Sequence, residues 1–421
     1  MRSESARHVL TLVSGRIAAA AIGILGAPII ARLFEPADFG IVALLVTVAT
    51  MLSQVLPLTY NNAIVIPREE SQARALVRAA MYASLILAIL IALLLMLLRI
   101  AGVPTPFSGQ LGAWEWLVPL VALMLALSLV CEGWLTRTKG FAASAKAVFG
   151  QALLTSGGRI SLGMAWGTSV WGLAVPYVAG VALRLGMLSR AAWLDRQPGM
   201  RPAAIRKVAF EYRDFPIFNL PAAFLRVLGV NLPILLLAPM FGPTAVGLYA
   251  MADRLIRVPV TMIADSVRRI YLQRASVILH KGGRLQPLYR RVTVYLVLMG
   301  LPPALLLLLV GEPLARILLG ERWAQAGTFV EILAPLLLVM LTVQPAAALL
   351  ALLRKQRLWL KLQLVSSLLR AVLMLAAWQA WRTEEGVLWG FVLGGALPYL
   401  WLMKYIYHLS GRPVESHGTS T

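Results

Sequence analysis

Seven arginines fall inside long apolar segments of this 421-residue chain. They are Arg16, Arg159, Arg184, Arg226, Arg254, Arg257 and Arg370. Acids in the same segments are fewer: Asp253, Asp265, Glu331 and, near a segment end, Glu132. A charge at the centre of a membrane-spanning helix costs about 2.5–3.5 kcal/mol on insertion scales, so such charges pair or face water. Arginines stay in excess even if every acid is paired. Since the guanidinium binds phosphate and carboxylate bidentately, this excess predicts an anionic ligand.

Other polar residues share helix faces with these arginines. The polar stripes are Gln151–Thr155–Arg159, Gln363–Ser367–Arg370 and Asn219–Arg226, at spacings of three, four or seven. Such spacings place side chains on one face of a helix, and a polar stripe on an apolar helix is typical of a cavity wall. Arg16, Arg159, Arg226, Arg370, Gln151, Thr155, Asn219 and Gln363 are therefore the predicted substrate-binding residues.

Several of these charges have simpler explanations. Arg16 and Arg184 lie near segment ends and could extend to the headgroups. Asp253 and Arg257, four residues apart, could form a structural ion pair or take part in ion coupling together with Asp265. Glu331 and Arg370 could serve packing alone. Arg159, Arg226 and Arg370 are the hardest to explain without a ligand, because each falls mid-segment.

The composition identifies the environment of the segments. Hydrophobic residues make up 59% of the chain and charged residues 14%, against about 25% charged residues in soluble domains. Apolar stretches of about 20 residues, the length that a helix needs to cross a bilayer, alternate with short polar loops. We expect an all-α polytopic membrane protein with twelve spans. They are 12–31, 38–58, 76–98, 113–134, 148–168, 170–190, 215–240, 243–266, 292–311, 327–350, 361–381 and 386–407.

A ten-residue motif occurs twice between adjacent spans. ARLFEPADFG at 31–40 returns as APMFGPTAVG at 238–247, so that Ala31, Phe34, Pro36 and Gly40 recur after 207 residues. Six spans precede the basic loop 191–214 and six follow it, which predicts a parallel repeat about an axis along the membrane normal. The expected parts are an N-terminal lobe (1–190), a cytoplasmic linker (191–214), a C-terminal lobe (215–407) and a tail (408–421).

The net charge of +21 follows mainly from topology. Of the Lys and Arg residues in the loops, at the chain ends and at the span ends, 27 fall on one face of the membrane and 5 on the other. Positive loops are retained in the cytoplasm, so both termini are expected there. Because the charge is dispersed over many loops, nucleic acid is not an expected partner. The single cysteine, Cys131, excludes an internal disulfide.

The sequence contains no motif for catalysis. No phosphate-binding loop, Ser-His-Asp set or metal signature is present, and the four histidines show no ligand spacing. We therefore expect a transporter rather than an enzyme, with no cofactor and with coupling to H⁺ or Na⁺ as an open alternative.

Several stretches resemble a known family. ARLFEPADFGIVAL, NNAIVIPREE, GPTAVGLYAMADRLIRVPVTMIADSVRRIYLQRAS and LLGERWAQAG closely resemble polysaccharide-biosynthesis membrane proteins, the Wzx-type repeat-unit flippases. These belong to a superfamily with the multidrug and toxic-compound extruders (MATE) and the lipid II flippases. The resemblance covers nearly the whole chain. It implies two six-helix lobes around a central cationic cavity, and alternation between inward- and outward-open states.

The resemblance also implies a cargo and a location. The expected substrate is an undecaprenyl-pyrophosphate-linked oligosaccharide, carried across the bacterial inner membrane for O-antigen, lipopolysaccharide, capsule or exopolysaccharide synthesis. Membrane lipids, a polysaccharide polymerase and a chain-length regulator are expected partners. A MATE-like drug or cation antiporter, a lipid II flippase and a non-transporting scaffold remain the alternatives. The excess of arginine over intramembrane acid argues against a cation exporter.

Overall fold

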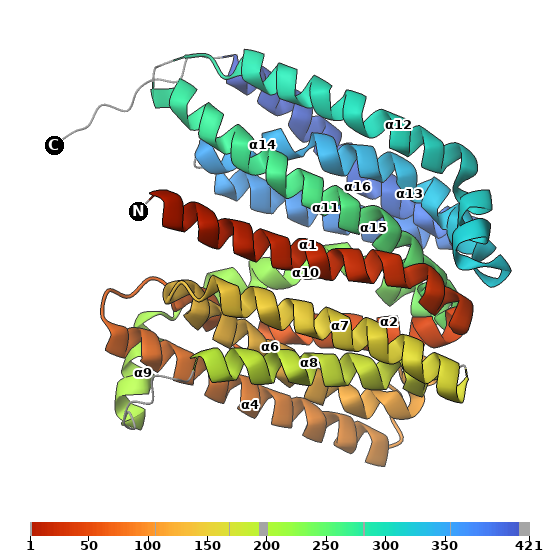
Figure 1. The fold of residues 1–421 in the computed structure, drawn as a ribbon, viewed down its shortest axis with the longest axis horizontal. Coiled ribbons are helices and arrows are strands. Elements are labelled where there is room, and N and C mark those ends of the chain that lie inside the picture. The colour runs from red at the N-terminus through yellow and green to blue at the C-terminus, as the bar shows by residue number, and fades with distance from the viewer. Residues whose placement is uncertain are drawn as a thin grey trace. The chain divides into compact units, whose positions relative to one another are not determined.

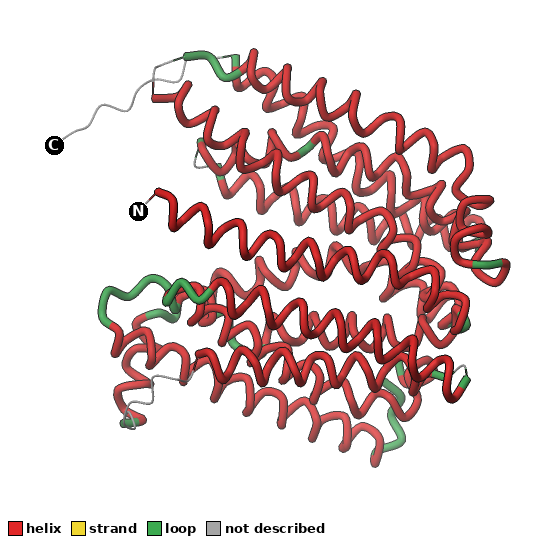
Figure 2. Tube along the Cα trace, in the orientation of Figure 1, coloured by secondary structure: helices red, strands yellow, loops and turns green. Residues whose placement is uncertain are grey.

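The structure is a computed structural model, and it describes most of the chain. The described residues are 2–105, 107–167, 169–192, 201–280, 283–353 and 355–411. Within them, no side chain is described for 2–14, Arg16, Ile17, Trp166, Asp265, His280, Ala351 and Gln356. These ranges contain helices and loops but no strand (Figure 2).

Each predicted span overlaps one long helix, and the span 327–350 also takes in most of the short helix that follows. The long helices are α1 (Arg2–Leu33), α2 (Pro36–Val55), α4 (Glu70–Ile100), α6 (Leu117–Arg137), α7 (Phe141–Trp166), α8 (Val170–Ala192), α10 (Leu220–Phe241), α11 (Pro243–His280), α12 (Gln286–Leu319), α13 (Ala324–Thr342), α15 (Gln356–Trp381) and α16 (Glu384–Ser410) (Figure 1). Nine helical segments of the described chain are long and apolar enough to cross a membrane. The protein is thus an all-α, multi-pass membrane protein, as expected, while the exact number of twelve spans stays a prediction.

Shorter helices connect the long ones. They are α3 (Tyr60–Ala63), α5 (Ser108–Leu111), η1 (Gly112–Trp116), α9 (Pro202–Glu211), the π-helical turn η2 (Phe215–Asn219), η3 (Glu321–Trp323) and α14 (Gln344–Leu352). Each copy of the repeated motif ends one long helix and begins the next. The first copy joins α1 to α2, and the second joins α10 to α11.

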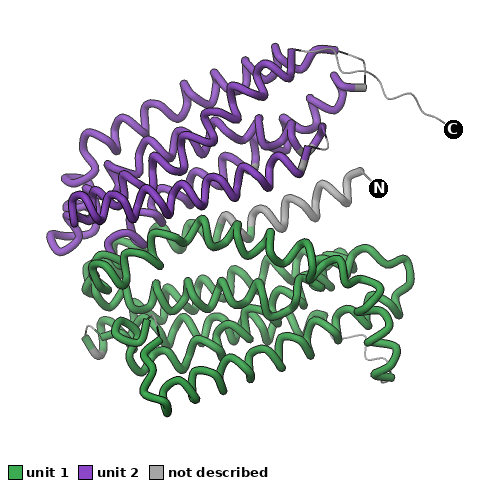
Figure 3. The backbone as a smooth tube through the Cα atoms, turned by 180° about the vertical axis from the view of Figure 1, so that it is seen from behind, with its two compact units in different colours: residues 1–247 green, residues 248–421 purple. Residues whose placement is uncertain are grey.

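The chain divides into two compact units, residues 1–247 and 248–421 (Figure 3). The division falls later than the predicted linker at 191–214, because α9 and α10 pack within the first unit. Ile205 of α9 is buried against α4, the Tyr60 hydroxyl donates to the Ala209 carbonyl at 3.0 Å, and Thr59 donates to the carbonyl of Phe215. Helix α10 packs along α2. The predicted pair of six-helix lobes therefore stays a prediction.

In the first unit, glycines bring α7 close to its neighbours. Helix α7 packs between α1 and α8, and α6 contacts both α4 and α8 (Figure 1). The fully buried ring of Phe34, from the repeated motif, lies against Gly163 of α7 and Gly172 of α8. A Cβ atom on Gly163 would lie 2.8 Å from that ring, and one on Gly172 would lie 2.9 Å from it. Small residues of this kind let helix backbones approach closely. Such packing holds helices together in a membrane, where the hydrophobic effect does not drive one helix onto another.

In the second unit, α12 packs on α13, and α15 packs on α16. Helix α12 is broken at Val310, whose φ of −135° is not helical. The Glu331 carboxylate of α13 accepts a hydrogen bond at 2.8 Å from the backbone N–H of Glu312, just after the break. A helix break leaves backbone N–H groups without partners. Glu331 thus has a structural role here, which was one of its two predicted alternatives.

Candidate functional site

The α7 stripe faces α8 at a proline. Pro176 lies inside α8 and has no N–H, which interrupts the helical hydrogen bonds of the preceding turn. The Nε of Arg159 donates to the carbonyl of Leu173 at 3.1 Å, and the Thr155 hydroxyl donates to the carbonyl of Pro176 at 3.4 Å. Arg159 is only 7% exposed, and its guanidinium lies 5.7 Å from the ring of Phe39 on α2. The structure therefore places two predicted binding residues at a helix–helix contact.

Gln151, the third residue of this stripe, belongs to an ion-pair network. Arg184 of α8 donates to the Gln151 side-chain oxygen at 3.1 Å and to the Glu132 carboxylate at 2.6 Å. Both partners of the ion pair are about one-fifth exposed, at 19% and 22% of their side chains. Arg184 is consequently neutralised by α6 within the first unit. Glu132 was recognisable from the sequence only as an acid near a span end.

The α15 stripe faces α16 in the same way but uses different chemistry. Arg370 is 8% exposed, and its guanidinium lies 4.7 Å from the centre of the Phe391 ring and 6.0 Å from that of Tyr399. A Cβ atom on Gly395 would lie 2.5 Å from the Arg370 guanidinium, and one on Gly394 would lie 2.6 Å from its Cα. The glycine pair thus makes room for a cation against two aromatic faces, an arrangement that stabilises a desolvated charge.

Tyr399 connects this cation to Gln363. Its hydroxyl donates to the Gln363 side-chain oxygen at 3.2 Å, so both outer residues of the predicted stripe lie in one contact region. Sequence reasoning missed Phe391 and Tyr399. Their spacing of eight residues, about two helical turns, together with the Gly394–Gly395 pair, is the signal that could have identified this face.

Asp253 and Arg257 pair along α11. The Arg257 Nε donates to the Asp253 carboxylate at 2.8 Å, and the two side chains are 27% and 26% exposed. The ion-pair alternative is therefore the arrangement that the structure shows, and the pair is still partly accessible. Buried Tyr249, one turn before Asp253, packs edge-on against Phe391 with ring centres 6.3 Å apart. Phe391 of α16 thus contacts both Tyr249 of α11 and Arg370 of α15.

Arg226 differs from all these arginines. It lies near the middle of the apolar segment Phe215–Phe241, and its side chain is exposed. It forms no hydrogen bond or ion pair with any residue that the structure describes. Asn219 is exposed on the same face, at the end of the π-helical turn η2. The remaining predicted residues, Arg16 and Asp265, lie outside the described side chains.

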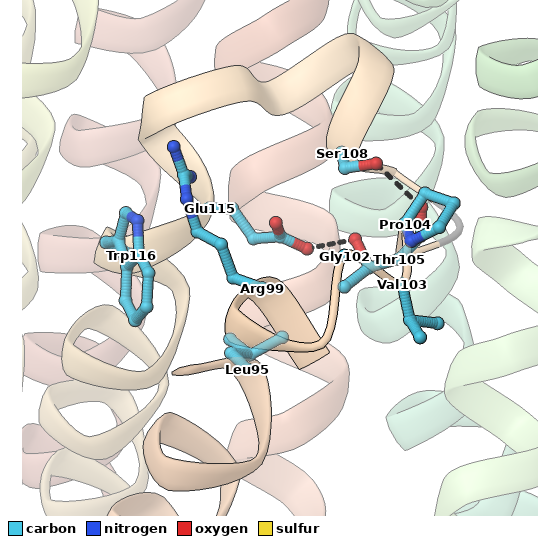
Figure 4. Close-up of a pocket in the computed structure, with 9 residues that line it drawn as sticks. All are labelled: Leu95, Arg99, Gly102, Val103, Pro104, Thr105, Ser108, Glu115 and Trp116. Carbon is cyan, nitrogen blue, oxygen red and sulfur yellow. Dashed lines mark hydrogen bonds between the residues drawn. The ribbon is translucent and has the colours of Figure 1, made fainter. Parts of the chain in front are cut away.

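Outside the predicted polar stripes, cavities and metal-ligating groups are the remaining candidate sites. A cavity of about 240 Å³ lies at the end of α4, where Arg99 stands 5.9 Å from the Trp116 ring and Thr105 bonds Glu115 (Figure 4). No group of three metal-ligating side chains occurs among the described residues. Outside the spans, burial raises the pKa of the Tyr60 hydroxyl, the group that holds α9.

The family described as polysaccharide biosynthesis protein matches residues 29–328, more than half of the chain. The chain belongs to this family. The resemblance found in the sequence is thereby confirmed.

A curated relative is the teichuronic acid biosynthesis protein TuaB of Bacillus subtilis, 23% identical over 124 residues. That match covers 30% of this chain and about a quarter (26%) of the relative's length. The lipid II flippase MurJ in an inward closed conformation aligns with a TM-score of 0.77 at 10% identity, covering 94% of this chain and 87% of MurJ. An inward-facing MATE family multidrug transporter of the MOP superfamily aligns with a TM-score of 0.68 at 15% identity, covering 93% and 95%. The polysaccharide biosynthesis protein therefore has the MATE-like fold.

Proposed function

We propose that this protein is a flippase for lipid-linked glycans. It moves undecaprenyl-pyrophosphate-linked repeat units across the bacterial inner membrane by alternating access, for O-antigen, capsule or exopolysaccharide synthesis. Membership of the polysaccharide biosynthesis family and a fold shared with a lipid flippase support this proposal. Both termini lie in the cytoplasm, and a polysaccharide polymerase and a chain-length regulator act on the product.

The observation that carries the proposal is the state of Arg226. An exposed guanidinium near the middle of a membrane helix, without a protein partner, is unfavourable in contact with hydrocarbon. It is stable where water or an anion reaches it. The pyrophosphate of a polyprenyl-linked glycan is an anion of this kind, and its polyprenyl chain remains in the lipid while the charged part passes Arg226.

The other arginines have supporting roles in this proposal. Arg159 and Arg370 are more than nine-tenths buried, so they contribute positive potential and hold helices rather than contact the cargo directly. Arg16 is assigned to the same path by its place in the sequence. Movement of an anion outward follows the inside-negative membrane potential, which contributes about 2.3 kcal/mol per charge per 100 mV.

Replacing Arg226 by glutamine tests the proposal. We expect surface polysaccharide to fall at least about tenfold, because a charge-assisted hydrogen bond contributes about 1.5–3 kcal/mol and about 1.4 kcal/mol is tenfold. Arg226→Lys should retain part of the activity, since it keeps the charge but not the planar fork. Surface polysaccharide is measured in a strain that lacks the chromosomal copy, with the membrane level of each variant quantified.

Arg99→Gln is the matched control. Arg99 is also exposed on a membrane helix, but it lies in the last turn of α4, where headgroups reach it. It should support normal polysaccharide. Wild-type polysaccharide from Arg226→Gln at an equal membrane level would remove the anion-binding role. Transport of a defined lipid-linked glycan by the purified protein in liposomes tests the flippase activity itself.

The partly exposed Asp253–Arg257 pair is the proposed coupling site. If a proton on Asp253 releases Arg257, Asp253→Asn should make transport in liposomes independent of an imposed pH gradient. If Asp253→Asn keeps the wild-type response to that pH gradient, Asp253 is not the proton-coupling residue. Sodium in place of protons is distinguished by imposing a Na⁺ gradient at constant pH.

A further inference from the structure

The beginning of α12 and the end of α16 form an open groove of about 480 Å³ within the second unit. The residues that line it are Gln286, Pro287, Arg290, Arg291 and Val294 of α12 and Tyr407 of α16. Two hydrogen bonds join its walls. The Gln286 side-chain amide donates to the carbonyl of Tyr407 at 3.4 Å, and the Tyr289 hydroxyl donates to the carbonyl of Met403 at 3.1 Å. The groove is therefore shaped by contacts within this unit.

Two neighbouring arginines give the groove its charge. Arg290 and Arg291 are both exposed, and neither forms an ion pair with any residue that the structure describes. The lining residues include no acid, and Tyr407 adds a phenol that is 37% exposed. Guanidinium groups bind the oxygen atoms of phosphate through two parallel hydrogen bonds. The groove thus has the chemistry of a phosphate site.

An exposed apolar stripe continues from the groove along α12. Val294, Leu298, Leu301 and Leu305 recur at spacings of four, three and four, so they share one face of the helix. They are 48%, 64%, 38% and 45% exposed, and Arg291 precedes them on the same face. At a rise of 1.5 Å per residue the stripe is about 17 Å long, close to half of the hydrocarbon core of about 30 Å. It has the length of the acyl chains of one leaflet.

The arginine pair and the stripe meet at the expected membrane interface. The predicted span begins at residue 292, directly after Arg291. The distribution of basic loops predicts that this end of α12 is cytoplasmic, and basic pockets on that side attract anionic headgroups. A free phosphate would match the arginines alone, whereas a phospholipid matches both the arginines and the stripe.

We propose that this groove binds an anionic phospholipid of the cytoplasmic leaflet. Arg290 and Arg291 hold the headgroup phosphate, and an acyl chain lies along the stripe that begins at Val294. The occupant is a resident lipid and not the transported cargo. Because the groove has one wall on α12 and one on α16, the bound headgroup joins the ends of these two helices.

Binding of dioleoylphosphatidylglycerol to the purified full-length protein tests the site, measured by native mass spectrometry across a lipid titration. We expect the affinity of the tightest site to fall at least about tenfold in Arg290→Gln/Arg291→Gln, since each basic residue near an anionic headgroup contributes about fivefold. The matched control is Arg268→Gln/Arg269→Gln. It removes an adjacent, exposed arginine pair on α11, outside the groove, and should bind the lipid as wild type does.

A second variant tests the groove without removing an arginine. Val294→Glu places a carboxylate four residues after Arg290 and three after Arg291, where it can pair with both. This carboxylate competes with the lipid phosphate, so binding should weaken as in the arginine variant. Val294→Gln has a side chain of the same size without the charge and should keep most of the affinity.

Four outcomes would overturn the proposal. Arg290→Gln/Arg291→Gln and Val294→Glu could both bind as wild type does, or the α11 control could weaken equally, which would reduce the effect to net charge. Dioleoylphosphatidylcholine could bind as tightly as the anionic lipid. Displacement of the lipid by equimolar inorganic phosphate would make the groove a site for free phosphate, and tighter arginine-dependent binding of undecaprenyl pyrophosphate would assign it to the cargo. No transport is measured, so the proposed function is tested separately by Arg226→Gln.

Discussion

The hairpins α7–α8 and α15–α16 hold a buried arginine in two different ways. Their first helices carry similar stripes, Gln151–Thr155–Arg159 and Gln363–Ser367–Arg370. On α7–α8 the guanidinium bonds a carbonyl beside a proline, whereas on α15–α16 it lies on a glycine pair between aromatic rings. The same sequence pattern thus places a hydrogen bond to a carbonyl and one aromatic ring around the first arginine, and a glycine pair and two aromatic rings around the second.

This difference determines what each hairpin tolerates. A hydrogen bond to a carbonyl depends on one nitrogen atom, and its loss leaves a buried acceptor without that partner. A cation against aromatic faces depends on space, since the ring and the guanidinium must approach each other. We therefore expect the stability of the α7–α8 hairpin to depend on the hydrogen-bonding groups of its arginine. The stability of the α15–α16 hairpin should depend on the size of the residues at its two glycine positions.

Gly394→Val should have the largest effect. The new side chain would start 2.6 Å from the Cα of Arg370, so α15 and α16 must separate along their contact. Overpacking of this kind costs about 1–3 kcal/mol and occasionally more, and a backbone collision belongs at the upper end. Thermal unfolding in detergent, followed by circular dichroism, measures the loss. Gly186→Val, on α8 with no neighbour within 4 Å, is the control and should unfold close to wild type. Equal melting of both variants would show that the glycine pair is not needed for packing.

Arg159→Met should have an intermediate effect. Methionine fills similar space but cannot donate to the Leu173 carbonyl, so the cost should be about 1–3 kcal/mol. The same thermal assay applies, with Arg159→Lys as a partial replacement that retains a donor. If Arg159→Met melts at the wild-type temperature, the bond to α8 contributes nothing to stability.

Tyr399→Phe should have the smallest effect. It keeps the ring beside Arg370 and removes only the hydroxyl that donates to Gln363, a loss of about 0.5–1.5 kcal/mol. Its counterpart Thr155→Val removes a longer bond to the Pro176 carbonyl and should cost no more. The measurement is again the unfolding midpoint. A cost for Tyr399→Phe larger than that of Arg159→Met would reverse the proposed difference between the hairpins.

Much of the candidate site could be found from sequence because charge in an apolar segment is conspicuous. Arg159, Arg370 and Arg226 were all recognised as mid-span charges, and Asp253 with Arg257 as a pair. The groups that hold Arg159 and Arg370 were not recognisable. The Leu173 carbonyl is a backbone atom and leaves no trace in residue types, and Phe391 and Tyr399 resemble ordinary apolar helix positions until α15 is placed beside them.

The sequence by itself determined that the chain lies in a membrane, that its fold is all-α, where its long helices approximately end, and that it contains a repeated motif. These features are local, since about 20 apolar residues need a helix in lipid wherever they lie in a fold. Only the tertiary structure decided which arginines are held by the protein and which is exposed. It also placed Tyr407 of α16 beside Arg290 and Arg291 of α12. Both facts depend on which helix faces lie against each other, and a helix face acquires a partner only when distant segments pack.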